Sequence, residues 1–292
     1  MNRISIWLVL GASIAALPQQ PSSTPKSDAD VVLAAVSRDD GILAGGIGLG
    51  KKLGPGNLSI EPLAKLDSSG EWKGFDCDAR HQDGCRKFEK EYLSKPHTYT
   101  IVSADGRGAT VSAAPTSLDE CFDYTGHGTY SGASIGRTAI AASSTEMFTT
   151  GASARRLTDR ESAPIRKSLS ALVPSKFDST EELRIYSVQL EGQSFLVIQR
   201  AFQDYGSKPG YETARLRLIL AIGAMQEGRF RLLHWKENVD DENELVLGTI
   251  HLTNGRDFLI TTTSDPESQL FRIYGIRNGR LAVVYSGGGA SC

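Results

Sequence analysis

The chain has 292 residues, 40% of them hydrophobic, and its 32 lysines and arginines nearly balance its 34 aspartates and glutamates. This length and hydrophobic content can supply a sizeable core, so a disordered chain is not expected. The formal net charge of −2 does not require a strongly basic face, so nucleic acid is not an expected partner.

The first residues have the features of a signal peptide, assigned to residues 1–16. Arg3 precedes an apolar stretch, and small residues at positions 13 and 15 fit cleavage after Ala15. The stretch is shorter than the roughly 20 residues that span a bilayer, so we expect export and no transmembrane segment after cleavage. Residues 17–30, rich in proline, serine and glutamine, are predicted to form a flexible leader.

Residues 31–150 are predicted to form a glycine-rich β half. Pro62 falls inside one strand pattern, so it must lie at a sheet edge or a bulge. A charged stretch, 86–93, can form a short helix, whereas 125–136 is rich in Gly, Ser, Thr and Tyr and predicts an irregular surface loop. Strands are expected at 31–37, 42–49, 58–66, 71–75, 97–102, 109–113 and 137–142.

Residues 151–176 are predicted to contain a connecting helix at 159–173. Thr158 as N-cap with Glu161 three residues later fits a capping box. Three apolar positions recur at helical spacing: Ile165, Leu169 and Leu172.

Residues 177–292 are predicted to form a β-meander half. Strands alternate with glycine turns at 183–190, 193–202, 214–224 and 229–236, and four more strands follow within 245–285. Asn254-Gly255 and Asn278-Gly279 predict two-residue type I′ turns, which need positive φ at both residues. Such turns would pair His251 with Phe258, Ile250 with Leu259, Tyr274 with Val283, and Arg272 with Tyr285.

Several of these strands carry apolar residues at both parities, as in Leu245-Val246-Leu247. Both faces of their sheet should therefore be covered by other elements. The expected fold is mainly β, with antiparallel meander sheets in a propeller-like or sandwich arrangement and one helix between the two halves.

Disulfides are expected, because the chain is predicted to be exported and has an even number of cysteines. Four cysteines allow three connectivities. The polar loop between Cys77 and Cys85 favours pairing of these two, which leaves Cys121 for Cys292. Zinc is not expected, because the cysteines lack the close pairs of a zinc site.

Gly132 to Gly136 matches G-x-S-x-G with Ser134 as nucleophile, but the strand-to-helix turn that the motif requires is not predicted there. His234 or His251 could act as the base, and Asp240 or Asp257 could orient it.

Gly126-His127-Gly128-Thr129 resembles the start of the subtilase histidine motif. That resemblance implies a catalytic His127, but no later segment matches the family's nucleophile motif.

No cofactor or metal site is expected. Gly45 to Lys51 approaches a P-loop, yet Lys52 stands where Ser or Thr must bind Mg²⁺. Asp76, Asp78 and Asp83 do not fit a calcium loop. Residues 240–242 with Glu244 are typical of a solvated turn, and calcium binding there is the alternative.

We therefore expect a secreted or periplasmic, disulfide-stapled β-rich protein that acts as a non-catalytic binding or structural module. The alternative is a secreted serine hydrolase using Ser134 with His127, His234 or His251. Neither the partner nor the substrate can be identified from the sequence.

Overall fold

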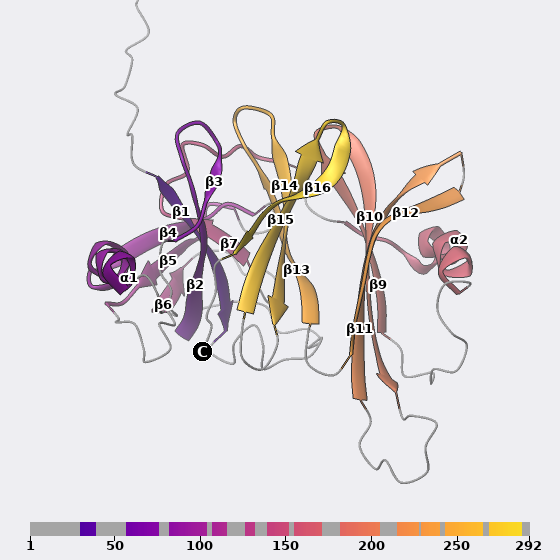
Figure 1. The fold of residues 1–292 in the computed structure, drawn as a ribbon, viewed down its shortest axis with the longest axis horizontal. Coiled ribbons are helices and arrows are strands. Elements are labelled where there is room, and N and C mark those ends of the chain that lie inside the picture. Colours follow the sequence, from indigo (N-terminus) through magenta and orange to yellow (C-terminus); the bar gives the residue numbers. More distant parts are fainter. Residues whose placement is uncertain are drawn as a thin grey trace, which may run out of the picture.

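The computed structural model contains three antiparallel sheets and is mainly β (Figure 1). It describes residues 30–38, 57–75, 82–103, 107–115, 126–131, 139–151, 155–170, 182–204, 215–227, 229–239, 243–264 and 269–287.

The N-terminal elements are seven strands and a short helix that continues into a π-helical turn. The strands are β1 (Val31–Arg38), β2 (Asn57–Leu66), β3 (Trp72–Lys73), β4 (His97–Ile101), β5 (Thr110–Ala113), β6 (Gly126–Ser131) and β7 (Ala139–Ala142). The helical segments are α1 (Gln82–Phe88) and η1 (Glu89–Leu93).

The remaining elements form two further sheets and one helix. They are β8 (Arg155–Arg156), α2 (Asp159–Ser170), β9 (Glu182–Leu190), β10 (Gln193–Asp204), β11 (Arg215–Gln226), β12 (Arg229–Val239), β13 (Asn243–His251), β14 (Asp257–Ser264), β15 (Gln269–Arg277) and β16 (Arg280–Gly287). Their sheet orders are β12-β11-β10-β9-β8 and β13-β14-β15-β16.

The first sheet has the order β1-β7-β4-β5-β6-β2-β3, and β1 also pairs with β2. Six strands therefore form a closed ring of pairings, with β3 attached to β2. One core cluster takes buried side chains from all six ring strands, including Val32, Ile60, Tyr99, Val111 and Tyr130. This cluster fills the interior of the ring.

The C-terminal four-stranded sheet lies between the ring and the five-stranded sheet (Figure 1). One core joins Leu33 and Ile140 of the ring to Phe258 and Ile273 of this sheet. A second core joins Val197 and its neighbours in the five-stranded sheet to the opposite face of the four-stranded sheet. The expectation that both faces of the meander are covered is thus confirmed, in a sandwich-like stack of layers.

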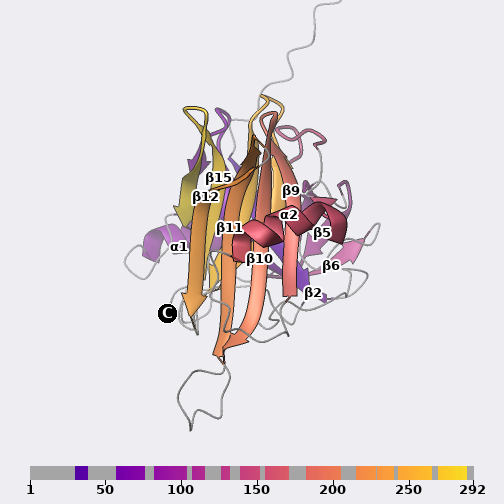
Figure 2. The same cartoon turned by 90° about the vertical axis from the view of Figure 1, so that its right-hand side faces the viewer.

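Helix α2 covers the outer face of the five-stranded sheet (Figure 2). Ile165 and Leu169 of the helix are buried there. The predicted capping box is present: the Glu161 carboxylate accepts the Thr158 N–H at 2.9 Å, and the Glu161 N–H lies 3.4 Å from Thr158 Oγ1.

Two local predictions in the N-terminal half are also confirmed. The β1–β2 register shifts between Leu33 and Ala34, which are paired with Ala64 and Pro62, so Pro62 adjoins a bulge. The charged stretch 86–93 is helical, although α1 begins earlier, at Gln82.

The prediction of an irregular loop at 125–136 is wrong for residues 126–131. These form β6, which pairs with β2 on one side and β5 on the other. A Cβ atom at Gly128 would lie 2.7 Å from Ile60 Cδ1 and from the Ser112 carbonyl oxygen. Glycine therefore serves close strand packing here, which composition alone does not distinguish from a loop.

The two Asn-Gly turns differ. Asn278 and Gly279 have φ of 52° and 71° and connect paired Arg277 and Arg280, as a two-residue type I′ turn requires. At the first turn only Gly255 has positive φ, and its N–H donates to the Leu252 carbonyl at 3.0 Å. This turn has three central residues, typical of a type I turn followed by a glycine bulge.

The register predictions change accordingly. In the first hairpin His251 faces Asp257 and Ile250 faces Phe258, one residue away from the predicted pairs. In the second hairpin Tyr274 faces Val283, as predicted, but a bulge between Ile273 and Tyr274 places Arg272 opposite Ser286 instead of Tyr285.

Several predictions fall outside the described residues: the signal peptide, the leader up to residue 29, the strand at 42–49, and the positions of Cys77, Cys121 and Cys292. Cys85 lies in α1, is fully buried and is not a free thiol. The predicted disulfide connectivity remains a prediction.

Candidate functional site

The first candidate site is a pair formed by His251, the last residue of β13, and Asp257, the first residue of β14. His251 Nδ1 lies 2.8 Å from Asp257 Oδ1, and the two side chains are 6% and 18% exposed. The other carboxylate oxygen accepts the backbone N–H of Glu191, in the β9–β10 turn, at 2.6 Å. A carboxylate only accepts hydrogen bonds, so Nδ1 carries the proton.

The segment before β8 packs directly against the His251 ring. A Cβ atom built on Gly151 would lie only 1.8 Å from His251 Cδ2, so no larger residue fits without a shift. The N–H of Thr149 donates to the His251 carbonyl at 2.9 Å. Arg107, in the β4–β5 connection, donates to the carbonyl oxygens of Phe148 and Thr149. The pair therefore lies where segments attached to all three sheets meet.

This arrangement supplies two of the three roles of a serine-hydrolase triad. In such a triad a carboxylate at Nδ1 fixes the tautomer and orientation of the histidine. Here Gly151 packs on the side of the ring that carries Nε2, where a Cβ atom would lie 2.1 Å from that nitrogen. The same pair also joins β13 and β14 to the β9–β10 turn. The geometry thus serves either general-base chemistry or a structural link between layers.

The second candidate site is a buried polar cluster centred on Glu244 of β13, whose side chain is fully buried. Glu244 Oε1 accepts hydrogen bonds from Thr261 Oγ1 at 2.8 Å and from the Tyr274 hydroxyl at 2.7 Å. Oε2 accepts from Arg272 Nη1 at 2.8 Å. His234 of β12 completes the cluster, with Nε2 3.3 Å from the Tyr274 hydroxyl oxygen.

The charges in this cluster balance. Burial and the neighbouring Glu244 raise the pKa of Tyr274, so the phenol stays protonated and donates. Burial lowers the pKa of His234, so its imidazole is neutral at pH 7. The remaining charges are the Glu244 carboxylate and the Arg272 guanidinium, which neutralise each other inside the protein.

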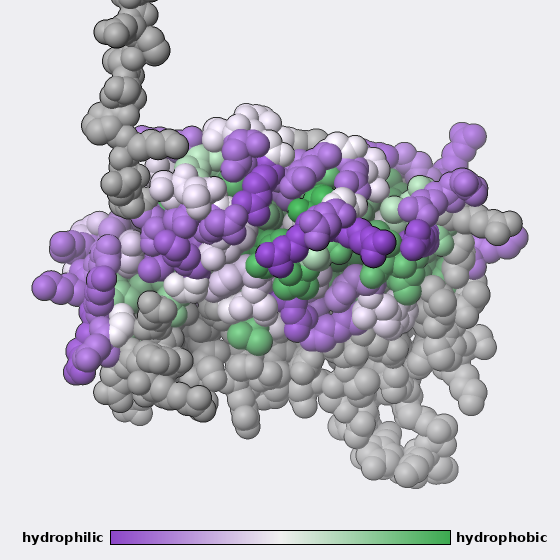
Figure 3. All heavy atoms as spheres, turned by 45° about the horizontal axis from the view of Figure 1, so that its top comes forward, coloured by the Kyte–Doolittle hydropathy of each residue, from purple (hydrophilic) through white to green (hydrophobic). Residues whose placement is uncertain are grey.

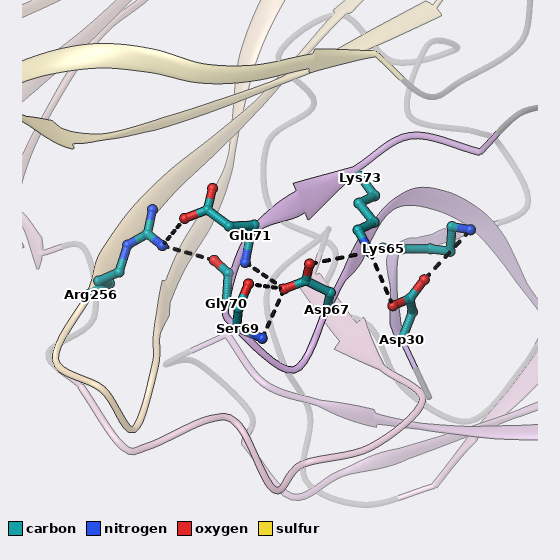
Figure 4. Close-up of polar contacts among 8 residues, drawn as sticks. All are labelled: Asp30, Lys65, Asp67, Ser69, Gly70, Glu71, Lys73 and Arg256. Carbon is teal, nitrogen blue, oxygen red and sulfur yellow. Dashed lines mark hydrogen bonds and ion pairs between the residues drawn. The ribbon is translucent and has the colours of Figure 1, made fainter. Parts of the chain in front are cut away.

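A third polar cluster connects the β2–β3 turn to the β13–β14 turn (Figure 4). Arg256 donates to the Gly70 carbonyl at 2.9 Å and to Glu71 Oε1 at 3.1 Å. Asp67 Oδ1 accepts from the Ser69 hydroxyl and from the backbone N–H groups of Ser69 and Glu71. These hydrogen bonds hold the pKa of Asp67 far below its usual range, and the bond from the Ser69 hydroxyl lowers it most.

This third cluster extends along the ring surface. Lys73 lies 3.2 Å from Asp67 Oδ2 and 3.9 Å from Asp30, which also faces Lys65 at 3.7 Å (Figure 4). The Lys73 side chain is half exposed. Exposed ion pairs of this kind contribute little stability. Because the cluster connects two turns, we call it the surface tether.

The structure brings some predicted site residues together and separates others. His251 and Asp257 are paired, whereas His234 lies beside Tyr274 in the Glu244 cluster. His127 belongs to β6, opposite Ser59, and its side chain is not described. Ser134, Asp240, the P-loop-like segment and the acidic residues Asp76 and Asp78 are outside the described residues.

Asp83 is nearly fully exposed and binds Arg86 within α1. Within the described residues, no three His, Cys, Asp or Glu side chains are grouped as a metal site requires.

The prediction that Glu244 lies in a solvated turn is wrong, because its side chain is fully buried within β13, and the sequence did not identify the cluster around it. One signal was available: Glu244, Arg272 and Tyr274 lie in strands whose other residues are mostly apolar, and a charge in such a strand needs a buried partner. Which charges meet depends on the register of β13, β14 and β15, and the bulges alter that register.

Among the described helices, none has the length and apolar character needed to cross a membrane. Comparisons with protein-family models, curated proteins and solved structures found no match to this chain.

Proposed function

We propose that the protein is an exported, disulfide-stapled binding or structural module without a catalytic centre. One observation carries this proposal: the side chain of Glu244 is fully buried, and its hydrogen bonds join β13, β14 and β15. Fully satisfied buried networks rigidify a core and specify its arrangement. A rigid stack of three sheets suits a protein that presents a surface.

The surface tether supports the same function. Arg256 binds the β2–β3 turn through Gly70 and Glu71 and lies over the Phe258 ring, 5.1 Å from its centroid. Trp72 packs edge-on against Phe258, with centroids 5.0 Å apart. These contacts join the ring to the four-stranded sheet.

The second candidate function is a secreted serine hydrolase using Ser134. The specific observation in its favour is the His251–Asp257 pair, which has the distance and tautomer of a base with its orienting carboxylate.

A serine-directed fluorophosphonate probe separates the two functions. The mature full-length chain is treated natively and after heat denaturation, and labelled peptides are mapped by mass spectrometry. A binding module gives no labelling that depends on the fold. Labelling of Ser134 that is lost on heating, and lost in His251→Gln with an unchanged melting temperature, would establish the hydrolase.

The export and disulfide parts of the proposal have their own test. The intact mass of the secreted protein should correspond to cleavage after Ala15. Non-reducing peptide mapping should link Cys77 to Cys85 and Cys121 to Cys292. A peptide that links Cys121 to Cys77 or Cys85 would refute the predicted pairing.

A further inference from the structure

Residues 254–256 and 278–280 have the same sequence, Asn-Gly-Arg, and each tripeptide lies at the turn of a hairpin. They contain the only two Asn-Gly pairs in the chain. Both asparagines are exposed, and both turns lie at the same end of the molecule, at the top of Figure 1. Figure 3, with this end turned forward, shows hydrophilic surface over much of it. Sequence and exposure to water therefore do not distinguish the two sites.

An asparagine followed by glycine can deamidate without an enzyme. The backbone nitrogen of the glycine attacks the side-chain carbonyl carbon of the asparagine. A new N–C bond forms, the bond to the side-chain nitrogen breaks, and ammonia leaves with the proton of the glycine N–H. Water then opens the succinimide ring at either carbonyl and gives aspartate or isoaspartate. Glycine favours this reaction, because no side chain hinders the attack or the backbone rotation that it requires.

At the first tripeptide the fold occupies both reacting groups. The Gly255 N–H donates to the Leu252 carbonyl at 3.0 Å. The Asn254 side-chain oxygen accepts the Arg256 N–H at 3.1 Å. Ring closure breaks both hydrogen bonds, because the nitrogen must give up its proton and the side chain must rotate onto it.

Neighbouring segments also hold this first turn. Leu252 is buried and pairs with Phe148, and the Arg256 side chain binds the β2–β3 turn (Figure 4). A Cβ atom at Gly70 would lie 3.0 Å from Asn254 Nδ2, so the amide group that must leave packs against the β2–β3 turn. Asn254 can therefore react only when contacts between two sheets open.

The second tripeptide lacks these restraints among the described residues. In a two-residue turn the closing hydrogen bond joins the residues on either side of the central pair, so it does not use the Gly279 N–H. No hydrogen bond within the described part of the chain involves this N–H or the Asn278 side chain. Nothing lies within 4 Å of the position that a Gly279 Cβ atom would occupy. The turn can therefore rearrange locally.

Two arginines flank the second site. Arg277 and Arg280 face each other at the base of the turn, and both are exposed. Like charges directly opposite each other on adjacent strands are destabilising. Deamidation places a carboxylate between these arginines, and their positive charge also favours the anion that forms when the nitrogen attacks.

We propose that Asn278 is a site of spontaneous deamidation and that the fold protects Asn254 from the same reaction. The substrate is the folded chain itself, and the co-reactant is water. The reaction needs no partner, so it goes beyond the proposed binding function and does not depend on it.

The modification alters the β15–β16 hairpin. Isoaspartate has one more carbon atom in the main chain than asparagine, so a two-residue type I′ turn no longer fits it. Among the described strands β16 pairs only with β15. Deamidation at Asn278 should therefore loosen β16, and the modified form should accumulate with the age of the protein.

The test is incubation of the mature full-length protein in mildly alkaline buffer, followed by mass spectrometry of the chymotryptic peptides 253–258 and 275–281. An isoaspartyl methyltransferase identifies the isoaspartate. Deamidation should be faster at Asn278 than at Asn254 by about tenfold or more, because two hydrogen bonds must break at Asn254. In urea the two rates should become similar, because only the shared tripeptide then matters.

Two matched variants separate the turn from the tripeptide. Arg256→Ala removes the contacts with the β2–β3 turn and should raise the rate at Asn254 by about threefold or more. Arg280→Ala changes the same position of the other tripeptide and should not raise the rate at Asn278, because the Arg280 side chain is exposed. Melting curves confirm that both variants fold. Hydrogen exchange at residues 281–286 should be faster in the deamidated fraction.

Equal rates at the two asparagines in the folded protein, or a faster reaction at Asn254, would overturn the proposal. So would an unreacted Asn278 after the time in which the chain in urea has deamidated. If Arg280→Ala raised the rate at Asn278 as much as Arg256→Ala raises it at Asn254, the arginine of the tripeptide and not the turn would control the reaction. Unchanged hydrogen exchange in the deamidated fraction would refute the loosening of β16.

Discussion

Replacing Glu244 by glutamine should destabilise the protein by about 2–3 kcal/mol, because it removes the negative charge that Arg272 requires. The new amide can still accept from Thr261 and Tyr274 through its oxygen, so those two hydrogen bonds survive. Its NH₂ group replaces Oε2, which accepts from Arg272 at 2.8 Å. The lost bond is charge-assisted and worth roughly 1.5–3 kcal/mol. Arg272 is 23% exposed, so water limits the penalty to the lower part of the 3–5 kcal/mol range for breaking buried pairs, about 3 kcal/mol.

The assay is equilibrium unfolding in urea, followed by tryptophan fluorescence, on Glu244→Gln, Arg272→Met and the double variant. Removing both charges leaves neither unpaired, so the double variant should be more stable than the sum of the single effects by about 1–2 kcal/mol. Additive effects, or a loss below about 0.5 kcal/mol for Glu244→Gln, would show that this ion pair does not compensate the buried charge.

Three further predictions concern single positions. Gly151→Ala should lower the free energy of unfolding by about 1–3 kcal/mol, because its Cβ would overlap the His251 imidazole. Gly74→Ala is the control, because its Cβ would meet only a hydroxyl at 3.4 Å. It should change the free energy of unfolding in urea by less than about 0.5 kcal/mol. Gly279→Val should lower the melting temperature by an amount equivalent to about 1 kcal/mol or more, because φ is +71° in open space; an unchanged melting temperature would contradict the turn assignment. The hydrogen bond from Arg155 and those from Thr158 lower the pKa of Glu161 to about 2, so the stability from this carboxylate is complete above its unfolded value of 4.5 and is lost as the pH falls toward 2. An NMR titration measures this pKa directly, and a midpoint near 4.5 would refute the capping contact.

The sequence alone determined the features that depend on neighbouring residues. The helix at α2 begins at its predicted capping box, because Thr158 and Glu161 are three residues apart and need no distant partner. Asn278-Gly279 forms the predicted type I′ turn, because positive φ is a local property of these residue types. The strands of the C-terminal half follow from apolar runs and glycine turns for the same reason.

The length of the turn between β13 and β14 could not be predicted from neighbouring residues alone. Asn254-Gly255 is compatible with either a two-residue or a three-residue turn, and the contacts around Leu252 select the second: its N–H donates to the Arg256 carbonyl, and it pairs with Phe148. Phe148 is more than a hundred residues away in the chain. One extra residue in the turn then brings His251 opposite Asp257 and creates the candidate pair.

Only the tertiary structure decided which polar residues became buried together and which glycines were needed for packing. Gly128 looks like a loop residue in sequence, yet Ile60 and Ser112 on neighbouring strands leave no room for a side chain. Glu244 meets Arg272 because three strands align in one bulged register and two further sheets cover them. Turn and capping preferences act within a few residues, whereas burial depends on segments that only folding brings into contact.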